Sequence, residues 1–309
     1  MVPRAAWFDR LALVAVLLTA AVAASVALPG CHRTGSVQVG RVPAQRSGGS
    51  ANMQEPPGAD TITGVAWIRV AVRGGGALAA AVARPAGAGP FPVVVVLHGS
   101  HGFAREYVRL ARDLARDANV VAVAGCWFTG GAAAGARFVT PIACPEAPPM
   151  SVSISADARW ADAREAVDAL VGAARALPGV RSDRVALVGH SRGAGTALQY
   201  AQALGEARGV RAAVLNSAGY PDDVLARARA VGVPILIIHG TADAPGDGGS
   251  AYTAVGRARA FEAALRAARK DVDAVYVDGG GHDGLFASAA QYDASVTRIA
   301  AFLRRRLLP

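Results

Sequence analysis

Short apolar runs alternate with longer amphipathic stretches from about residue 61 to the end of this 309-residue chain. The runs are rich in Val, Ile and Leu, which is typical of strands buried on both faces of a sheet. The stretches between them place apolar residues at helical spacing and charges on the opposite side. The pattern predicts eight strands, at 63–72, 77–85, 91–98, 119–124, 184–189, 211–216, 233–239 and 272–277.

The connections between these strands indicate how the sheet is built. A run of three glycines, residues 74–76, separates the first two strands and favours a hairpin. Most later strands are separated by helices, which implies crossover connections and a mainly parallel sheet with helices on both faces. The sequence therefore predicts one α/β domain over residues 61–309. The predicted helices lie at 104–117, 156–177, 194–204, 254–269 and 288–306.

Residues 1–30 have the pattern of an export signal. Two arginines within the first ten residues precede an uncharged, apolar stretch, 11–30. The run Leu28-Pro29-Gly30-Cys31 resembles a bacterial lipobox, although Pro29 departs from the small or aliphatic residue usual at that position. Three outcomes stay open: a lipoprotein with a lipid on Cys31, a soluble secreted protein, or an uncleaved N-terminal membrane anchor of about 20 residues.

The segment 31–60 is polar and rich in Gly, Pro and Ser, so it is predicted to be a disordered tether between membrane and domain. If Cys31 is lipidated, Cys126 and Cys144 remain as an even pair in an oxidising compartment. We therefore predict a disulfide between them, with two buried free thiols as the alternative. No two cysteines form a C-x-x-C pair, which disfavours a zinc site.

Composition narrows the classes of partner. The formal net charge is +9, and the arginines stand singly along the predicted helices rather than in a block interleaved with aromatic residues. This distribution disfavours nucleic-acid binding and weakly favours anionic surfaces or substrates. Hydrophobic residues make up 52% of the chain, which is enough for a sizeable core.

A predicted strand, a sharp turn and a predicted helix surround Gly189-His190-Ser191-Arg192-Gly193. In this context G-x-S-x-G is typical of a nucleophile elbow, whose strained turn exposes the serine. Glycines two positions either side of the serine prevent backbone clashes. Ser191 is therefore the candidate nucleophile, and an ordinary glycine-rich turn is the alternative.

A serine hydroxyl attacks only when a base takes its proton and an acid orients that base. Of the six histidines, His282 is the best candidate, because its glycine-rich loop follows the last strand at the edge where active-site loops gather. His32 lies in the tether, and His190, adjacent to the nucleophile, should point elsewhere. His98 and His239 end buried strands and are predicted to be hydrogen-bonded core histidines or histidines that support a catalytic residue by contacting it.

The acid should come from another loop at the same edge of the sheet. The strand 211–216 is followed by no carboxylate, whereas 233–239 is followed by Asp243. Asp243 is the leading candidate and Asp247 the fallback, with a solvated turn aspartate as the alternative for either. The order Ser191, Asp243, His282 is the chain order given for α/β-hydrolases.

An oxyanion intermediate needs preorganised N–H donors, usually two from the backbone. One is expected from Arg192, directly after the nucleophile. The other is expected from the HGSHG loop after the third strand, from Ser100 or alternatively His101. His101 is also predicted to line the substrate pocket.

Two loops shape the expected pocket. Only about residues 217–232 separate the sixth and seventh strands, too few for a lid domain. The longest irregular stretch, 125–155, follows the fourth strand at the edge of the sheet where the catalytic residues are expected. Long irregular loops are often functional. We predict that it walls the pocket with Trp127 and Phe128 and is braced by the predicted disulfide. An inert surface loop is the alternative.

The motifs HGSHG, GHSRG, HGTAD and GGGHDG, in this order, resemble the α/β-hydrolase superfamily over about residues 61–309. Within it the chain is most similar to the dienelactone hydrolase-like and serine acyl-esterase groups. The resemblance implies an eight-stranded, mostly parallel sheet with an antiparallel second strand, and no metal or organic cofactor. Dienelactone hydrolases proper have cysteine where this chain has Ser191, which favours general ester cleavage over dienelactone itself.

Together these features predict an exported, membrane-tethered serine hydrolase that cleaves carboxylic esters through an acyl-enzyme. A serine peptidase or an acyltransferase on the same fold is one alternative. A non-catalytic tethered binding protein is another, because a fold does not determine a function.

Overall fold

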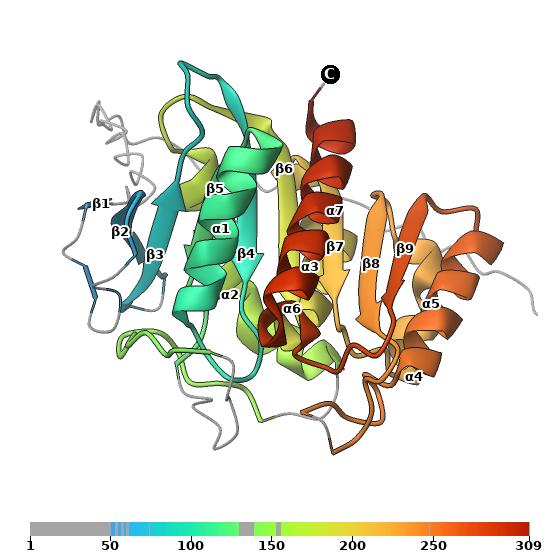
Figure 1. Ribbon diagram of the computed structural model, residues 1–309. Helices are drawn as coiled ribbons and strands as arrows, with labels where there is room; N and C mark the ends of the chain where they lie inside the picture. The colour runs from blue at the N-terminus through green and yellow to red at the C-terminus, as the bar shows by residue number, and fades with distance from the viewer. Residues whose placement is uncertain are drawn as a thin grey trace, which may run out of the picture. The chain divides into compact units, whose positions relative to one another are not determined.

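A computed structural model describes residues 51–52, 55–56, 59, 62–73, 75–129, 139–152, 156–246 and 248–308. In these residues nine strands form one sheet in the order β1-β2-β3-β5-β4-β6-β7-β8-β9 (Figure 1). β3 runs antiparallel to both β2 and β5, and neighbours from β5 to β9 are parallel. The strands are β1 (Ala51–Asn52), β2 (Val65–Ala71), β3 (Ala77–Ala83), β4 (Phe91–Leu97), β5 (Val121–Gly125), β6 (Val180–His190), β7 (Val210–Asn216), β8 (Ile235–Gly240) and β9 (Val272–Val277).

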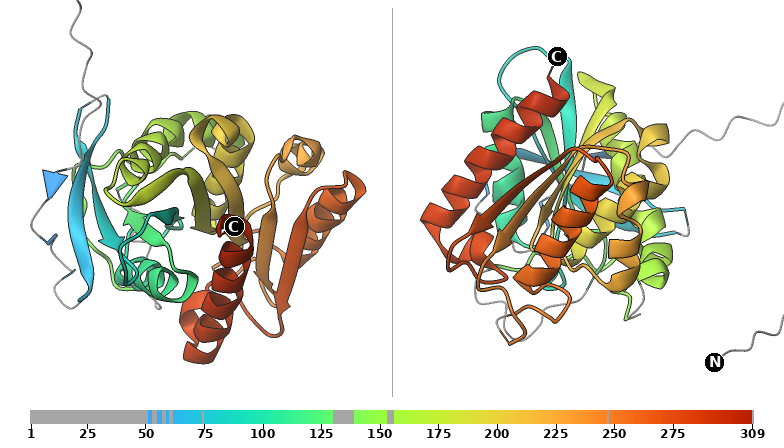
Figure 2. Two further views of the ribbon diagram at one scale, coloured as in Figure 1. Left: turned by 90° about the horizontal axis from the view of Figure 1, so that it is seen from above. Right: turned by 90° about the vertical axis from the view of Figure 1, so that its right-hand side faces the viewer.

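Helices cover both faces of the sheet. α1 and α7 lie side by side on one face, and α2 and α3 lie together on the other (Figure 2). α5 packs on β8 and β9 at the far edge. The helices are α1 (Arg105–Ala118), α2 (Ala156–Arg175), α3 (Arg192–Leu204), α4 (Asp222–Ala226), α5 (Val255–Ala267), α6 (Gly284–Ala287) and α7 (Ala289–Leu307).

The predicted fold class, a mostly parallel sheet with helices on both faces and no large lid, is confirmed. Every residue of β3 and β5 is buried, as the apolar runs indicated, because helices cover both sides of the sheet. The packing is close: a Cβ on Gly125 of β5 would lie 2.4 Å from the side chain of Leu170 in α2. Between β7 and β8 the chain forms only α4 and a single 3-10 turn, so no lid domain is inserted there.

The structure differs from the sequence prediction at several short elements. Ala51 and Asn52 lie in the range predicted as tether, yet they form β1 by pairing with β2, which would otherwise present an open edge. α4 and α6 were not predicted, since four or five residues are too few to show helical periodicity. The predicted signal, Cys31 and most of the tether lie outside the described residues. Within the described part of the chain, no helix is long and apolar enough to span a bilayer.

The sheet brings the candidate residues to one edge. The carboxyl ends of parallel strands point the same way, and ligands of open α/β sheets bind beyond them. The HGSHG loop follows β4, Ser191 follows β6, Asp243 follows β8 and His282 follows β9. Four segments far apart in sequence therefore meet where the chemistry was expected.

Candidate active site

Ser191 stands at the turn between β6 and α3 in a strained conformation, with φ 53° and ψ −118°. Its N–H donates to the carbonyl of Asn216 at 2.8 Å, which ties the turn to β7. The flanking glycines are required by close packing: a Cβ on Gly189 would lie 2.3 Å from the Gly193 carbonyl oxygen, and one on Gly193 would lie 2.3 Å from the Leu97 carbonyl oxygen. The turn is thus built as the motif predicts.

Ser191, His282 and Asp243 form one hydrogen-bonded chain. The Ser191 Oγ lies 2.9 Å from His282 Nε2, and His282 Nδ1 lies 2.9 Å from Asp243 Oδ2. The carboxylate accepts from Nδ1–H, which leaves the Nε2 lone pair to accept the serine hydroxyl. The side chain of Asp243 has no exposed surface and that of His282 is 5% exposed. Because the three groups are in contact and His282 and Asp243 are buried, His282 can take the serine proton.

Asp243 is held by donors on both carboxylate oxygens. Oδ2 accepts hydrogen bonds from His282 Nδ1 and, at 3.1 Å, from His239 Nε2. Oδ1 accepts one from the Thr253 hydroxyl at 3.1 Å. Burial alone would raise the pKa of this carboxyl, but the hydrogen bonds from His239 and then His282 outweigh burial and lower the pKa to about 2. Asp243 is therefore ionised at neutral pH. The fallback acid, Asp247, lies outside the described residues.

The contact of His239 with Asp243 was not predicted from the sequence. His239 was predicted to be a hydrogen-bonded core histidine or one that supports a catalytic residue, and the ring is fully buried at the end of β8. The His-Gly-Thr-Ala-Asp spacing after a strand was the available signal, because a tight turn of four residues returns the aspartate to the strand end. Thr253, which caps the other carboxylate oxygen, carried no sequence signal.

The residues beside the nucleophile and the base are bonded to each other. His190 Nε2 lies 3.0 Å from Asp283 Oδ1, and His190 Nδ1 lies 2.6 Å from Asn216 Oδ1. The ring of His190 thus points away from the Ser191 hydroxyl, as expected. Burial raises the pKa of Asp283, but the bond from His190 outweighs it and the net pKa is lowered. This pair joins the loop of His282 to the turn of Ser191.

His101 does not line the substrate cavity, which corrects the prediction made for its side chain. Its Nε2 lies 2.5 Å from the Tyr107 hydroxyl, which itself accepts the Gly99 N–H at 2.9 Å. Gly102, with φ 93°, turns the loop so that His101 stacks on Tyr107 and His190 instead. Burial and the neighbouring His190 lower the pKa of His101 to about 4.

His101, His190 and Asp283 are also the one group in the described residues whose side chains could together ligate a metal ion. One ligand atom from each lies within 4.8 Å of the others. The same side chains already bond to one another or to Tyr107 and Asn216. Their polar atoms are thus satisfied by protein partners, and the geometry gives no reason to place an ion there.

A cavity of about 210 Å³ opens beside the Ser191 hydroxyl. Trp127 and Phe128 line it, as predicted for the long irregular loop, and each is 3% exposed. Residues 130–138 and 153–155 of that loop lie outside the described part of the chain. The remaining lining comes mainly from α2, α3 and the segment between β8 and α5, and includes Ser100, Ser151, Arg159, Asp162, Arg192, Thr196, Val224, Tyr252 and Thr253.

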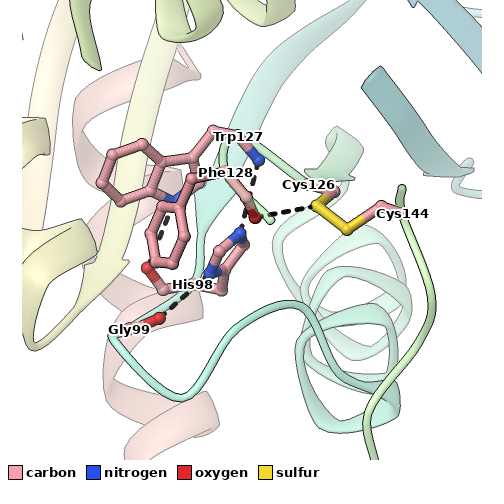
Figure 3. Close-up of a disulfide and its surroundings, with 6 residues drawn as sticks. All are labelled: His98, Gly99, Cys126, Trp127, Phe128 and Cys144. Atoms are coloured by element: carbon pink, nitrogen blue, oxygen red, sulfur yellow. Dashed lines mark hydrogen bonds between the residues drawn. A yellow bond between two sulfur atoms is a disulfide. The ribbon is translucent and has the colours of Figure 1, made fainter. Parts of the chain in front are cut away.

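A disulfide anchors the loop that carries Trp127 and Phe128. Cys126 and Cys144 are bonded, with their Cα atoms 6.5 Å apart. Figure 3 shows Trp127 and Phe128 directly beyond Cys126, against the ring of His98. The Trp127 N–H lies 3.3 Å from His98 Nε2, and the indole N–H donates to the His98 carbonyl at 3.1 Å. Burial lowers the pKa of His98 to about 3, so its ring is neutral and can accept from Trp127.

The two expected oxyanion donors come from two segments that both adjoin the nucleophile. A Cβ on Gly99 would be 3.3 Å from Ser191 Cβ, so the HGSHG loop passes against the serine. Ser100 and Arg192 both line the cavity. Among the described residues, neither backbone N–H donates to a protein acceptor, so both remain for a ligand.

The cavity carries two guanidinium groups. Arg192 donates to the Ser151 carbonyl at 2.7 Å and to Ser100 Oγ at 3.3 Å. Burial and the nearby Arg159 both lower the pKa of Arg192. Among the described residues Arg159 has no ion-pair partner, and the Asp162 carboxylate, which also lines the cavity, accepts from the Ser151 hydroxyl. Two guanidinium groups against one carboxylate leave a net positive charge that favours an anionic ligand.

Comparison with known proteins decides the family. Residues 78–301, well over half of the chain, match the dienelactone hydrolase family. The chain belongs to this family. No curated protein matches its sequence significantly.

Solved structures share the fold of this family member at low sequence identity. A dienelactone hydrolase-like promiscuous phosphotriesterase from metagenomic libraries is 20% identical with a TM-score of 0.58, covering 79% of this chain and 99% of its own. A thermostable esterase from Pseudomonas putida is 19% identical with a TM-score of 0.57, covering 80% and 85%. A Pyrococcus furiosus esterase is 16% identical with a TM-score of 0.56, covering 79% and 93%.

The close packing at the turn predicts opposite effects for two glycines of α3. Gly193→Ala would place a Cβ 2.3 Å from backbone, so we expect the free energy of unfolding to fall by about 3 kcal/mol or more. Gly195→Ala meets nothing within 4 Å and should leave that free energy unchanged or raise it by up to about 1 kcal/mol. Urea unfolding measures both, and equal destabilisation would contradict the described packing.

Proposed function

We propose that this protein is an exported serine hydrolase that cleaves carboxylic esters through an acyl-enzyme intermediate. The observation that carries the proposal is the continuous contact from Ser191 through His282 to the ionised Asp243, at 2.9 Å each, beside a cavity. Membership of the dienelactone hydrolase family and the esterases among the structural neighbours support ester hydrolysis.

Each step uses a group already in position. Ser191 Oγ attacks the ester carbonyl while its proton passes to His282 Nε2, and Asp243 stabilises the resulting imidazolium. The N–H groups of Ser100 and Arg192 hold the oxyanion. His282 then gives its proton to the leaving alcohol, which leaves an acyl group on Ser191. Water, activated by His282, hydrolyses this ester and restores the free serine.

The cavity supports a small substrate. Its volume of about 210 Å³ is below the roughly 300–1,000 Å³ of drug-sized ligand sites. Trp127 and Phe128 offer an apolar wall, and Arg159 and Arg192 offer positive charge. We therefore propose short-chain esters, with a preference for those whose acyl chain ends in a carboxylate.

Export is supported by the sequence of residues 1–31 and by the cysteine usage. Disulfides persist in oxidising compartments, and Cys126 is bonded to Cys144. We propose that a lipid on Cys31 tethers the catalytic domain to a membrane outside the cytoplasm.

Replacing the nucleophile tests the central role of Ser191. Ser191→Ala should lower kcat/KM for a short-chain chromogenic ester by at least about 10³-fold, because the acyl-enzyme cannot form. The variant should also lose labelling by a fluorophosphonate probe. Ser182→Ala, an exposed serine at the other end of β6, is the matched control and should behave as wild type. Equal rates in the Ser191 variant and wild type would remove the proposal.

The charge in the cavity predicts a change of selectivity. The measurement compares kcat/KM for a monosuccinate and a butyrate ester of one chromogenic alcohol. Arg159→Gln should lower the succinate-to-butyrate ratio about tenfold, since one partly shielded charge interaction is lost. Arg164→Gln removes an equal charge from the exposed side of α2 and should keep the ratio. An unchanged ratio in both variants would show that Arg159 does not select for anions.

The tether predicts the behaviour of a Cys31→Ser variant in a bacterial host. Wild type should incorporate radiolabelled palmitate and sediment with membranes, and the variant should lose both properties. Membrane sedimentation without label would instead indicate an uncleaved anchor. Unlabelled protein in the soluble exported fraction would indicate simple secretion.

A further inference from the structure

His239 occupies an unusual place beside the catalytic carboxylate. It is the penultimate residue of β8, and its side chain has no exposed surface. Its Nε2 lies 2.5 Å from the Thr253 carbonyl oxygen and 3.1 Å from Asp243 Oδ2. His239 does not line the substrate cavity, so substrate binding does not explain its position.

The surroundings decide which nitrogen of His239 carries the proton. Both neighbours of Nε2 are acceptors, so Nε2 is protonated and donates to them. Nδ1 is buried and has no hydrogen-bond partner among the described residues. A proton on Nδ1 would leave a buried donor unpaired, which is costly. His239 therefore directs its Nε2–H at the Thr253 carbonyl and at Asp243.

One carboxylate oxygen thus serves two imidazoles. Asp243 Oδ2 accepts Nδ1–H of His282 at 2.9 Å and Nε2–H of His239 at 3.1 Å. Thr253 Oγ1 bonds to the other oxygen at 3.1 Å. These three donors hold a carboxylate that is shielded from water, and each restricts its rotation.

We propose that His239 is a positioning residue of the active site, which donates Nε2–H to Asp243 Oδ2 and so holds the carboxylate ionised and oriented toward His282. The proposal rests on the proposed function, since it assigns His282 the role of base. It extends the chain of Ser191, His282 and Asp243 by a fourth side chain that acts only through Asp243.

Loss of this donor has a defined electrostatic consequence. Burial raises the pKa of Asp243, and the hydrogen bond from His239 is the first of the contacts that counteract it. Without that bond the anion is a stronger base and keeps only His282 and the Thr253 hydroxyl as donors, so the Asp243–His282 pair binds a proton at higher pH. The acid side of the kcat/KM profile should therefore move to higher pH.

The other titratable groups near the pair are unchanged by a substitution at His239. Asp243 faces only His239 and His282 among the titratable groups that hydrogen-bond to it. The ring of His282 lies 5.4 Å from that of His190, with Asp283 and His101 behind it. A shifted profile in a His239 variant thus reports on the lost bond.

Three substitutions separate donation from packing. His239→Gln can place an amide N–H near the position of Nε2, His239→Asn reaches only the position of Nδ1, and His239→Leu fills space without a donor. Because a hydrogen bond to a charged group is lost, we expect the Leu and Asn variants to lose about ten- to a hundredfold in kcat. Their KM should stay near that of wild type, and the acid side of their kcat/KM profile should move to higher pH. The Gln variant should have a kcat within about threefold of wild type and a wild-type pH profile.

A substrate-independent readout accompanies the kinetics. The low-field proton resonance of the His282 Nδ1–H should shift in the Leu and Asn variants and return in the Gln variant. Thermal unfolding verifies that each variant is folded, and if the Leu variant fails to fold, the Gln and Asn pair decides. Wild-type kcat and pH profile in all folded variants would overturn the proposal. Equal losses in Gln and Asn, with unshifted profile and resonance, would also overturn it by showing a packing role.

Failure of the proposed function would look different. Wild type would then neither hydrolyse the ester panel nor react with a fluorophosphonate. The His282 resonance would still show whether His239 positions Asp243.

Discussion

The approach of α3 to the end of β4 is the constraint on which the site depends. Gly193 packs against the carbonyls of Leu97 and His98, and Gly189 packs against Gly193. This contact holds Ser191 at φ 53° and presses the HGSHG loop against the serine. The proposed nucleophile and the proposed oxyanion donors are therefore placed by one backbone contact, which leaves no room for a side chain.

The second requirement is a carboxylate that stays ionised without water. Asp243 meets it through donors from three segments: the end of β8, the segment before α5 and the loop after β9. The bond between His190 and Asp283 then joins the His282 loop to the serine turn. The cavity is lined by α2, α3, the disulfide-braced loop and the same segment before α5. Thr253 therefore belongs to both sets of contacts, because it lines the cavity and bonds to Asp243.

The sequence predicted what depends on periodicity and on strand ends. The parallel strands, the turn at Ser191 and the meeting of His282 with Asp243 follow from apolar runs and from loops that share one edge. The contact of His239 with Asp243 and the short helix α6 depend on how loops fold back, which no periodicity encodes. His101 was assigned to the cavity because it stands in a glycine-flanked loop. The turn at Gly102 and the Tyr107 hydroxyl instead hold its ring against Tyr107 and His190.

Mass spectrometry of protein quenched during turnover tests the central claim most directly. With a slowly deacylated chromogenic ester, we expect one acyl group to accumulate and to map to the peptide that contains Ser191. The group should disappear at the rate at which activity recovers after the ester is exhausted. Ester turnover with an unmodified Ser191 peptide, or with the acyl group on another residue, would contradict it.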